Sequence, residues 1–323
     1  KKKKKRPTSS EDDEEDEEDD EPTPEDIAAA ASGGVAKDFD AIPATWGGIQ
    51  LTNLDAFVIP DFVSNVLGLD VDKIWRDLLA MRPYEVLQDQ SKFPPIERTL
   101  DKARIIPGYH HALMGRTQQV LPRHKVWFQD LSTSDGNQDD FLKYYYTGWQ
   151  TMIAPAQCDI SAMPATTKTL FKKLNERMPK GEKLNHGIFT LYADGDDCID
   201  PHFDKLKSFE DGSWFIVIKL GNARKFRFQD REDDKNILFD EKLPAGTAIV
   251  VKSDTANVQT KHSVPRKLGA DVSGSIVFRQ IKERLPWADM IKKMKGARKG
   301  KQKRRREKEK NPKTDVTMNA EKK

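Results

Sequence analysis

The feature that most constrains the fold is a series of short segments, rich in aromatic and β-branched residues, between Val120 and Ile281. Residues of these types are enriched in β-strands. Many short strands separated by closely spaced turns predict an all-β sandwich or barrel, of which the double-sheet jelly roll is one form. The segments are VWF (126–128), KYYYTGW (143–149), GIFTLY (187–192), WFIVIKL (214–220), KFRFQ (225–229), TAIVVKS (247–253) and SIVFRQI (275–281).

Helical patterns precede and interrupt these strands. After a predicted strand near 54–59, apolar residues at helical spacing predict one or two helices that end near residue 88. The segment TTKTLFKKLNERM (166–178) predicts another helix, and residues 89–120 are expected to form a loop. Gly221-Asn222, between two strand segments, predicts a β-hairpin. The expected fold class is therefore α+β, mainly β, with helices flanking a jelly-roll core.

Charged segments at both ends limit the part of the chain that can form a core. Residues 1–50 join KKKKKR and EDDEEDEEDDE to a linker rich in Ala, Gly and Pro, and residues 291–323 form a basic block. Such segments bury too little apolar surface to fold, so both are expected to be disordered around one domain at 51–290. The net charge of +3 is thus a cancellation between opposed segments.

The basic block suggests a nuclear location, or binding to DNA or RNA phosphates without sequence preference. A solvated tail without a partner is the simpler alternative. Cys158 and Cys198 form no CxxC motif, which favours a reducing, intracellular compartment. No apolar run approaches about 18 residues, so no membrane partner is expected. The chain opens on lysines without Met, so we expect a fragment that lacks its native N-terminus and any signal there.

The segment YADGDDCIDPHFD (192–204) carries the strongest chemical signal. In a strand, residues i and i+2 share a face, so His202 and Asp204 can point to one spot. A third ligand must come from another strand, and His262 qualifies because it follows the apolar segment 247–253 after a short loop. Two histidines and one carboxylate form the facial triad of non-haem iron(II) sites, which leaves coordination positions open. Catalytic zinc is an alternative, although the HExxH motif is absent, and each histidine alone is also compatible with a surface loop.

The same residues resemble a known family. TLYADGDDCIDPHFD resembles the N-x-Y-x-x-G-x-D-x-I-x-x-H-x-D segment of AlkB-like, 2-oxoglutarate-dependent iron(II) dioxygenases. NVQTKHSVP (257–265), followed by SIVFRQI, resembles the segments that carry the family's second iron histidine and its closing arginine. LPRHKVWFQD (121–130) and YYYTG (144–148) resemble segments upstream of the double-stranded β-helix. The resemblance runs from about Leu51 to Ile281.

What the resemblance implies is a double-stranded β-helix that uses Fe(II), 2-oxoglutarate and dioxygen, with ascorbate as a reductant in vitro. It also implies roles for three groups of residues: the iron ligands, the residues near the co-substrate and the metal, and an aromatic residue that stacks on a flipped base in the duplex-DNA demethylases. In this sequence the groups are His202, Asp204 and His262; Tyr192, Arg279 and Asn257; and Tyr146. Packing within a strand is the plainer interpretation of Tyr146 and its tyrosine neighbours.

Several positions depart from the family pattern. Thr190 replaces the asparagine two residues before the tyrosine, and Ser273 replaces an arginine, six residues before Arg279, that anchors 2-oxoglutarate. Arg266 is nearby in sequence but is expected in a loop. Leu206 replaces the acidic residue that reads the base. The pattern thus predicts an intact iron site without the family's base-reading residue.

Two functions of different classes follow from these observations. The first is a dioxygenase that hydroxylates C–H bonds and, on N-methyl groups, releases formaldehyde. Its substrate would be alkylated DNA or RNA, as in DNA repair, or alternatively a protein side chain. The second is a non-catalytic protein, associated with nucleic acid, that keeps the scaffold, and the arginine missing at 273 motivates it. The sequence does not specify an oligomeric state.

Overall fold

The structure of the chain is a computed structural model, which describes residues 45–52, 54–81, 110–114, 119–130, 140–142, 144, 157–179 and 181–286. The predicted basic block at 291–323, nearly all of the predicted N-terminal charged region, and Tyr146 lie outside the described residues. Within the described ranges, no helix is both long and apolar enough to span a membrane.

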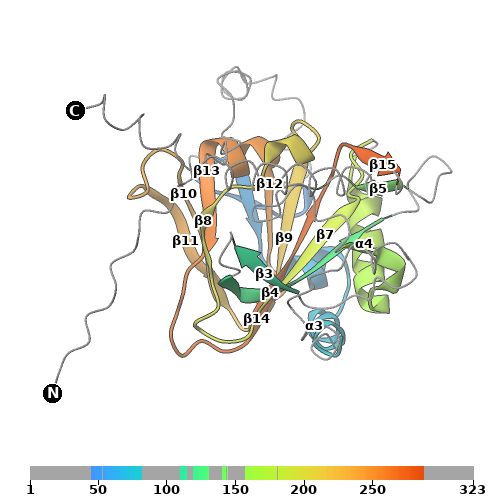
Figure 1. Cartoon of the computed structure of the whole chain (residues 1–323), viewed down its shortest axis with the longest axis horizontal. Coiled ribbons are helices and arrows are strands. Elements are labelled where there is room, and N and C mark those ends of the chain that lie inside the picture. The colour runs from blue at the N-terminus through green and yellow to red at the C-terminus, as the bar shows by residue number, and fades with distance from the viewer. Residues whose placement is uncertain are drawn as a thin grey trace, which may run out of the picture.

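The described residues are mainly β-strands, with a few short helices (Figure 1). The strands are β1 (Ile49–Gln50), β2 (Ala56–Ile59), β3 (His110–Met114), β4 (Gln119–Gln129), β5 (Asp140–Leu142), β6 (Gln157–Asp159), β7 (His186–Tyr192), β8 (Ile199–His202), β9 (Trp214–Gly221), β10 (Arg224–Asp230), β11 (Ile237–Leu243), β12 (Ala248–Lys252), β13 (Thr260–Val264), β14 (Ser273–Arg279) and β15 (Arg284–Pro286). The helices are the α-helices α3 (Val71–Leu79) and α4 (Ala165–Arg177), the π-helical segments η1 (Phe62–Val66) and η8 (Thr255–Gln259), and the 3₁₀ turns η6 (Ile160–Ala162) and η7 (Leu206–Ser208).

Two sheets face each other. The larger has the strand order β1-β2-β12-β9-β14-β7-β4-β3, with β6 paired in parallel to β4, and the smaller has the order β11-β10-β13-β8. From β7 to β14 the chain passes repeatedly between them, because β7, β9, β12 and β14 lie in the larger sheet and β8, β10, β11 and β13 lie in the smaller one. This winding of antiparallel strands is a double-stranded β-helix, so the predicted fold class is confirmed. A separate two-stranded sheet pairs β15 with β5.

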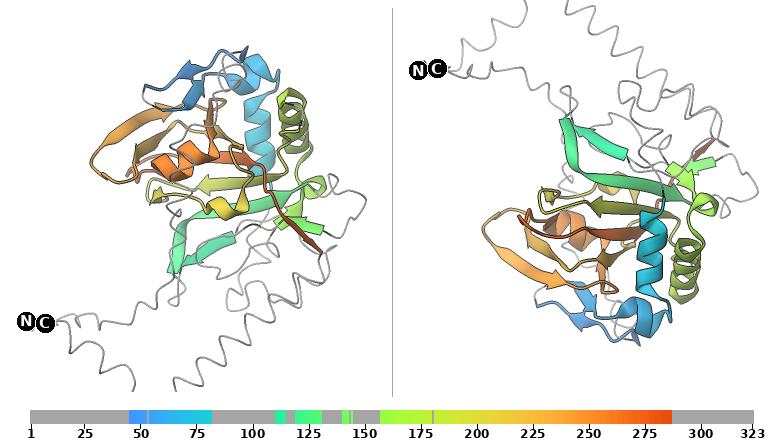
Figure 2. Two further views of the ribbon diagram at one scale, coloured as in Figure 1. Left: turned by 90° about the horizontal axis from the view of Figure 1, so that it is seen from above. Right: turned by 90° about the horizontal axis from the view of Figure 1, so that it is seen from below.

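The larger sheet is covered on both faces. Helices α3 and α4 lie side by side on one face, and the smaller sheet faces the other (Figure 2). Side chains alternate along β9, so Ile216 and Ile218 pack with the helices, whereas Phe215 and Val217 point between the sheets. A strand buried on both faces reads as a continuous apolar run, which explains the segment WFIVIKL. The candidate site lies in the space between the two sheets.

The hairpin predicted at Gly221-Asn222 is wrong. β9 pairs with β12 and β14, whereas β10 pairs with β11 and β13, so the turn carries the chain from one sheet to the other. Gly221 has φ 65°, and a Cβ there would lie 2.6 Å from the Trp75 ring. The same turn residues serve a hairpin and a crossing between sheets, and only the pairing of the flanking strands distinguishes the two.

The other predicted elements are confirmed to different extents. α4 matches the predicted helix at 166–178, and β2 matches the strand near 54–59. Residues 110–114 and 119–120 belong to β3 and β4, so the predicted loop at 89–120 is wrong there, and its other residues lie outside the described ranges. β3 is held by backbone pairing to β4 at the end of the larger sheet, which residue preference does not reveal. Of the predicted strand at 143–149 the structure describes only Tyr144, which is not in a strand.

Candidate metal and co-substrate site

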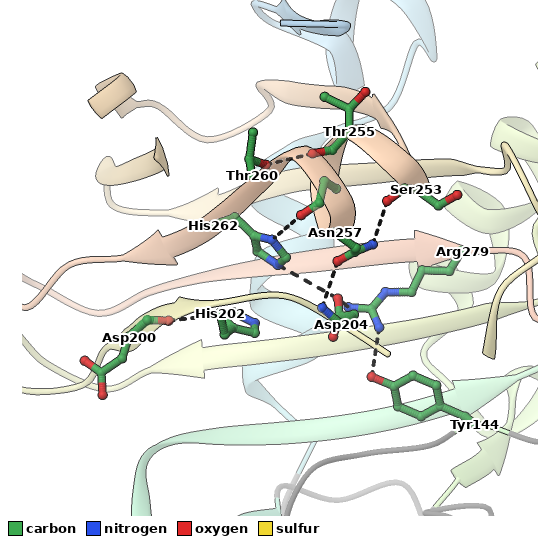
Figure 3. Close-up of polar contacts among 11 residues, drawn as sticks. Tyr144, Asp200, His202, Asp204, Ser253, Thr255, Asn257, Thr260, His262 and Arg279 are labelled. Atoms are coloured by element: carbon green, nitrogen blue, oxygen red, sulfur yellow. Dashed lines mark hydrogen bonds and ion pairs between the residues drawn. The ribbon is translucent and has the colours of Figure 1, made fainter. Parts of the chain in front are cut away.

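The strand pairing of the smaller sheet brings the three predicted metal ligands together. His202 ends β8 and lies directly opposite His262 of β13, with 4.4 Å between their ring centroids. Asp204 follows two residues after His202, and its Oδ2 is 3.8 Å from Nε2 of His262 (Figure 3). All three side chains line the same cleft between the sheets.

Both histidines have a fixed ring orientation. Nδ1 of His202 lies 2.9 Å from the carbonyl oxygen of Asp200, and Nδ1 of His262 lies 3.3 Å from that of Ala256. Because a carbonyl only accepts hydrogen bonds, each Nδ1 carries the proton and each Nε2 presents its lone pair. Burial lowers the pKa of both imidazoles, to about 3 for His202, where His262 lowers it further. Both rings are therefore neutral near pH 7, as metal ligands must be.

Asp204 provides a buried carboxylate. Burial by itself favours the neutral acid, but the Arg279 guanidinium and the two imidazoles outweigh this effect and lower the pKa of Asp204 to about 2. Nη2 of Arg279 lies 3.0 Å from Oδ2 of Asp204. Among the described residues, no donor is aligned to hydrogen-bond this oxygen, despite the short distance. Asp204 is thus ionised, and Oδ2 retains its capacity to bind a cation.

Asn257 holds the main chain of Asp204 in place. It is fully buried in the π-helical segment η8, and its side-chain oxygen accepts a hydrogen bond from the Asp204 amide at 2.7 Å. Its amide group donates to the carbonyl oxygen of Ser253 at 2.9 Å. Arg231 donates to the main-chain oxygen of Asn257 and lies over the Phe203 ring. Asn257, which the resemblance placed near the metal and co-substrate, therefore contacts the main chain of the candidate ligand Asp204.

The three side chains fit a divalent metal in chemistry more closely than in geometry. Within the described residues, no group of three or more His, Cys, Asp or Glu side chains forms a ready-made metal site. Donor atoms bound to one ion at about 2.0–2.2 Å lie roughly 3 Å apart in octahedral geometry and roughly 3.5 Å apart in tetrahedral geometry, so the 3.8 Å between Asp204 and His262 is wider than either. The donor set itself suits such an ion, because it combines two neutral imidazoles with an ionised carboxylate.

The cleft between the two sheets has largely apolar walls with a few polar groups, as small-molecule sites usually do. Tyr192 lines it from the end of β7, where burial raises its pKa. Arg279 lines it from the end of β14, and its Nη1 donates to the Tyr144 hydroxyl at 2.8 Å. The structure therefore places both predicted co-substrate contacts in the cleft that holds the three candidate ligands.

The acidic turn in YADGDDCIDPHFD joins two strands that carry candidate site residues, and hydrogen bonds hold it in place. Oδ1 of Asp194 accepts hydrogen bonds from the amides of Asp196 and Asp197, which closes the turn. The buried Arg224 donates to the carbonyl oxygens of Asp194, at 2.8 Å, and of two further residues in the turn. A Cβ at Gly195 would lie 2.0 Å from the carbonyl oxygen of Lys267, so the turn requires glycine there. The turn connects β7, which carries Tyr192, to β8, which carries His202.

The departures from the family pattern have different locations. Thr190 is buried and lines the cleft, whereas Arg266 is exposed and lies 3.4 Å from Asp196. Ser273 is buried at the end of β14 opposite to Arg279, and Leu206 begins the turn η7. Arg266 therefore does not line the cleft in place of the missing arginine. Tyr146 lies outside the described residues.

Three residues near the cleft were not predicted. Lys125 lines it, Lys219 is buried on the face of β9 that points toward it, and Tyr144 contacts Arg279. The sequence does contain a signal for Lys219, because it is a lysine inside the otherwise apolar segment WFIVIKL. Lys125 and Tyr144 lie in segments whose pairing is not evident from residue preference.

The double-stranded β-helix is the fold that the resemblance to AlkB-like dioxygenases implies. No protein-family model matches the chain, and no curated protein sequence matches it. It is similar to a solved structure described as "The structure of OsALKBH1", with 12% identity, a TM-score of 0.43, and coverage of 72% of this chain and 99% of that chain. It is also similar to a prolyl hydroxylase from Trichoplax adhaerens in complex with a hypoxia inducible factor peptide fragment, with 10% identity, a TM-score of 0.37, and coverage of 80% and 90%. These values are low, and the strand order given above is what establishes the fold.

Proposed function

We propose that the chain is an Fe(II)- and 2-oxoglutarate-dependent oxygenase that hydroxylates, and thereby demethylates, alkylated nucleic acid. The observation that carries this proposal is the meeting of His202, Asp204 and His262 in one cleft between the sheets. Tyr192 and Arg279 line the same cleft, as expected for residues that contact the co-substrate.

When bound, ferrous iron would supply open coordination positions for 2-oxoglutarate and dioxygen and the oxidising power for C–H hydroxylation. The chain's own residues would prepare the site for it. The two histidines present unprotonated Nε2 atoms, and Asp204 is held ionised by Arg279. Asn257 fixes the main chain of Asp204. The apolar walls, including Phe215 and Phe226, limit the access of water to the reacting atoms.

Nucleic acid as the substrate is supported by the AlkB-like resemblance and by the basic block at 291–323, which lies outside the described residues. Leu206, where nucleobase demethylases have an acidic residue, is the observation that keeps a protein side chain as the alternative substrate. The basic block also supports an intracellular, nuclear location.

The test is the formation of succinate by purified full-length chain with iron(II), ascorbate and 2-oxoglutarate. We expect turnover that an Asp204→Ala variant lacks. Asp200→Ala is the matched control, because the Asp200 side chain is exposed and His202 contacts only its main-chain oxygen. Release of formaldehyde from N-methylated oligonucleotides, but not from methylated peptides, would support nucleic acid as the substrate. The absence of succinate from folded, iron-loaded protein with every candidate substrate would exclude the oxygenase.

A non-catalytic, nucleic-acid-binding protein is the second candidate, and Ser273 in place of an arginine favours it. This function predicts salt-dependent binding to random-sequence DNA, without turnover, that is lost when residues 292–313 are deleted. Binding that survives the deletion would exclude this segment as the binding element.

A further inference from the structure

Lys219 is a buried cation on the strand that forms one wall of the cleft. It is only 1% exposed, near the end of β9. Phe215 and Val217, which precede it at alternate positions, both line the cleft. Because side chains alternate along a strand, Lys219 points into the same space between the sheets. Its Nζ lies 5.9 Å from the ring centroid of Phe226, another residue of the cleft wall.

The Lys219 ammonium group has no hydrogen-bond partner among the described residues. A buried charge without a partner is costly, so such groups are usually paired or lose their charge. Burial, together with the nearby cation Arg224, lowers the pKa of Lys219 to about 8. An anionic group in the cleft would provide the interaction that the described residues do not.

Lys219 lies away from the three candidate metal ligands. It is opposite Ser275 on β14, whereas Arg279, beside Asp204, ends the same strand four residues later. The other buried lysine at the cleft, Lys125, is close enough to shift the pKa values of His202, Asp204 and His262. It lies on β4, three strands from β9 and at the same level of the sheet as Lys219. The register thus places Lys219 away from Arg279 and Asp204 along the sheet.

The residues around Lys219 suit a carboxylate. Ser275 and Tyr192 both line the cleft, and Ser275 lies directly opposite Lys219 on the paired strand. Hydroxyl groups can donate to a carboxylate that an ammonium group neutralises.

We propose that Lys219 binds the distal carboxylate of 2-oxoglutarate and takes the place of the arginine that is absent at Ser273. The inference rests on the proposed function, because it needs the oxo-acid end of the molecule to lie at His202, Asp204 and His262. The plainer alternative is that Lys219 only packs against Phe226, in which case its removal would not change ligand preference.

The test compares two acids that differ only at the distal end. Calorimetric titrations of the full chain with Mn(II), without turnover, would measure the affinities for 2-oxoglutarate and for 2-oxopentanoate, which has a methyl group in place of the distal carboxylate. In Lys219→Met we expect the affinity for 2-oxoglutarate to fall about 10- to 100-fold, as for loss of a hydrogen bond to a charged group. The affinity for 2-oxopentanoate should change less than about twofold, and Lys219→Arg should keep the preference for 2-oxoglutarate.

The matched control is Lys125→Met, which removes the lysine close to the candidate ligands and should leave the preference between the two acids in place. The thermal midpoint of Lys219→Met should stay unchanged or rise, because a charge without a partner is removed. Equal losses for both acids, no loss for either, or a selective loss in Lys125→Met would overturn the assignment. If the unaltered chain binds neither acid with Mn(II), the proposed function fails as well; if it binds 2-oxoglutarate and Lys219→Met keeps the preference, only this inference fails.

Discussion

Arg279→Met tests whether the ion pair with Asp204 belongs to a metal site. Arg279 is 4% exposed, and its guanidinium contacts the Asp204 carboxylate at 3.0 Å and the Tyr144 hydroxyl at 2.8 Å. Removal of one partner from a buried ion pair leaves an uncompensated charge and typically costs about 3–5 kcal/mol of stability. In a metal chelator, we expect a loss of this size in the free energy of unfolding.

A bound divalent cation would compensate Asp204 in place of the guanidinium. The loss should then shrink to about 1–2 kcal/mol, which reflects the hydrogen bond to Tyr144 and the packing of the arginine stem. The difference between the two states is about 2–3 kcal/mol. By linkage, Arg279→Met should therefore bind the metal about 30- to 150-fold more tightly than the unaltered chain.

The assay is urea denaturation with chelator and with excess Mn(II), together with direct titration of the metal at one pH. Arg224→Met is the matched control, because Arg224 is equally buried and donates to main-chain carbonyls of the acidic turn and Pro265. Its loss of stability should be the same in both states. An equal loss in both states for Arg279→Met would refute the view that Asp204 and Arg279 form part of a metal site.

Three further outcomes are expected. Asn257→Ala should reduce stability by about 2–4 kcal/mol, because it leaves the Asp204 amide and the Ser253 carbonyl without their partner, and urea denaturation checks this. In chelator, stability should fall as the pH drops from 6.5 toward 3, because unfolded His202 takes up a proton that the folded state excludes. Because the His202 ring is only partly shielded from solvent, its share of this loss in the free energy of unfolding should be about 2 kcal/mol. His202→Gln should remove that share, which urea denaturation at a series of pH values would measure. Gly195→Ala should cost about 1–3 kcal/mol, seen as a lower thermal midpoint, because its Cβ would meet the Lys267 carbonyl; Gly212→Ala, where a Cβ meets no atom but φ is 62°, separates that clash from backbone strain alone.

The sequence predicted those parts of the fold that depend on local patterns. The apolar run of β9 and the helical spacing of apolar residues in α4 each indicate, within one segment, which residues are buried. The spacing of His202 and Asp204 was sufficient to suggest a shared site, although only His202 lies in β8 and Asp204 follows the end of that strand. The third residue, His262, was selected by its position after the apolar segment 247–253, and the resemblance supported that choice.

Long-range pairing accounts for the features that the sequence did not predict. The turn at Gly221 gave a hairpin signal, yet β9 and β10 lie in different sheets. β11 and β13 alternate polar and apolar residues less regularly and were not predicted, although β13 delivers His262. The contact between Tyr144 and Arg279 joins residues 135 positions apart. Local residue preference contains no information on which distant strand will supply such a partner.

The absence of an arginine at Ser273 is a weak argument against a working co-substrate site, because the sheet offers an equivalent position. Ser273 of β14 pairs with Gly221 of β9, and Lys219 lies two residues before Gly221 on the same face. Diagonal neighbours of this kind are about 7–8 Å apart, within reach of a long side chain. A cation from β9 can therefore serve the region that a side chain at 273 would serve from β14. The sequence of β14 alone shows that an arginine is missing at position 273. The pairing of β14 with β9 shows that Lys219 provides a positive charge close to that position.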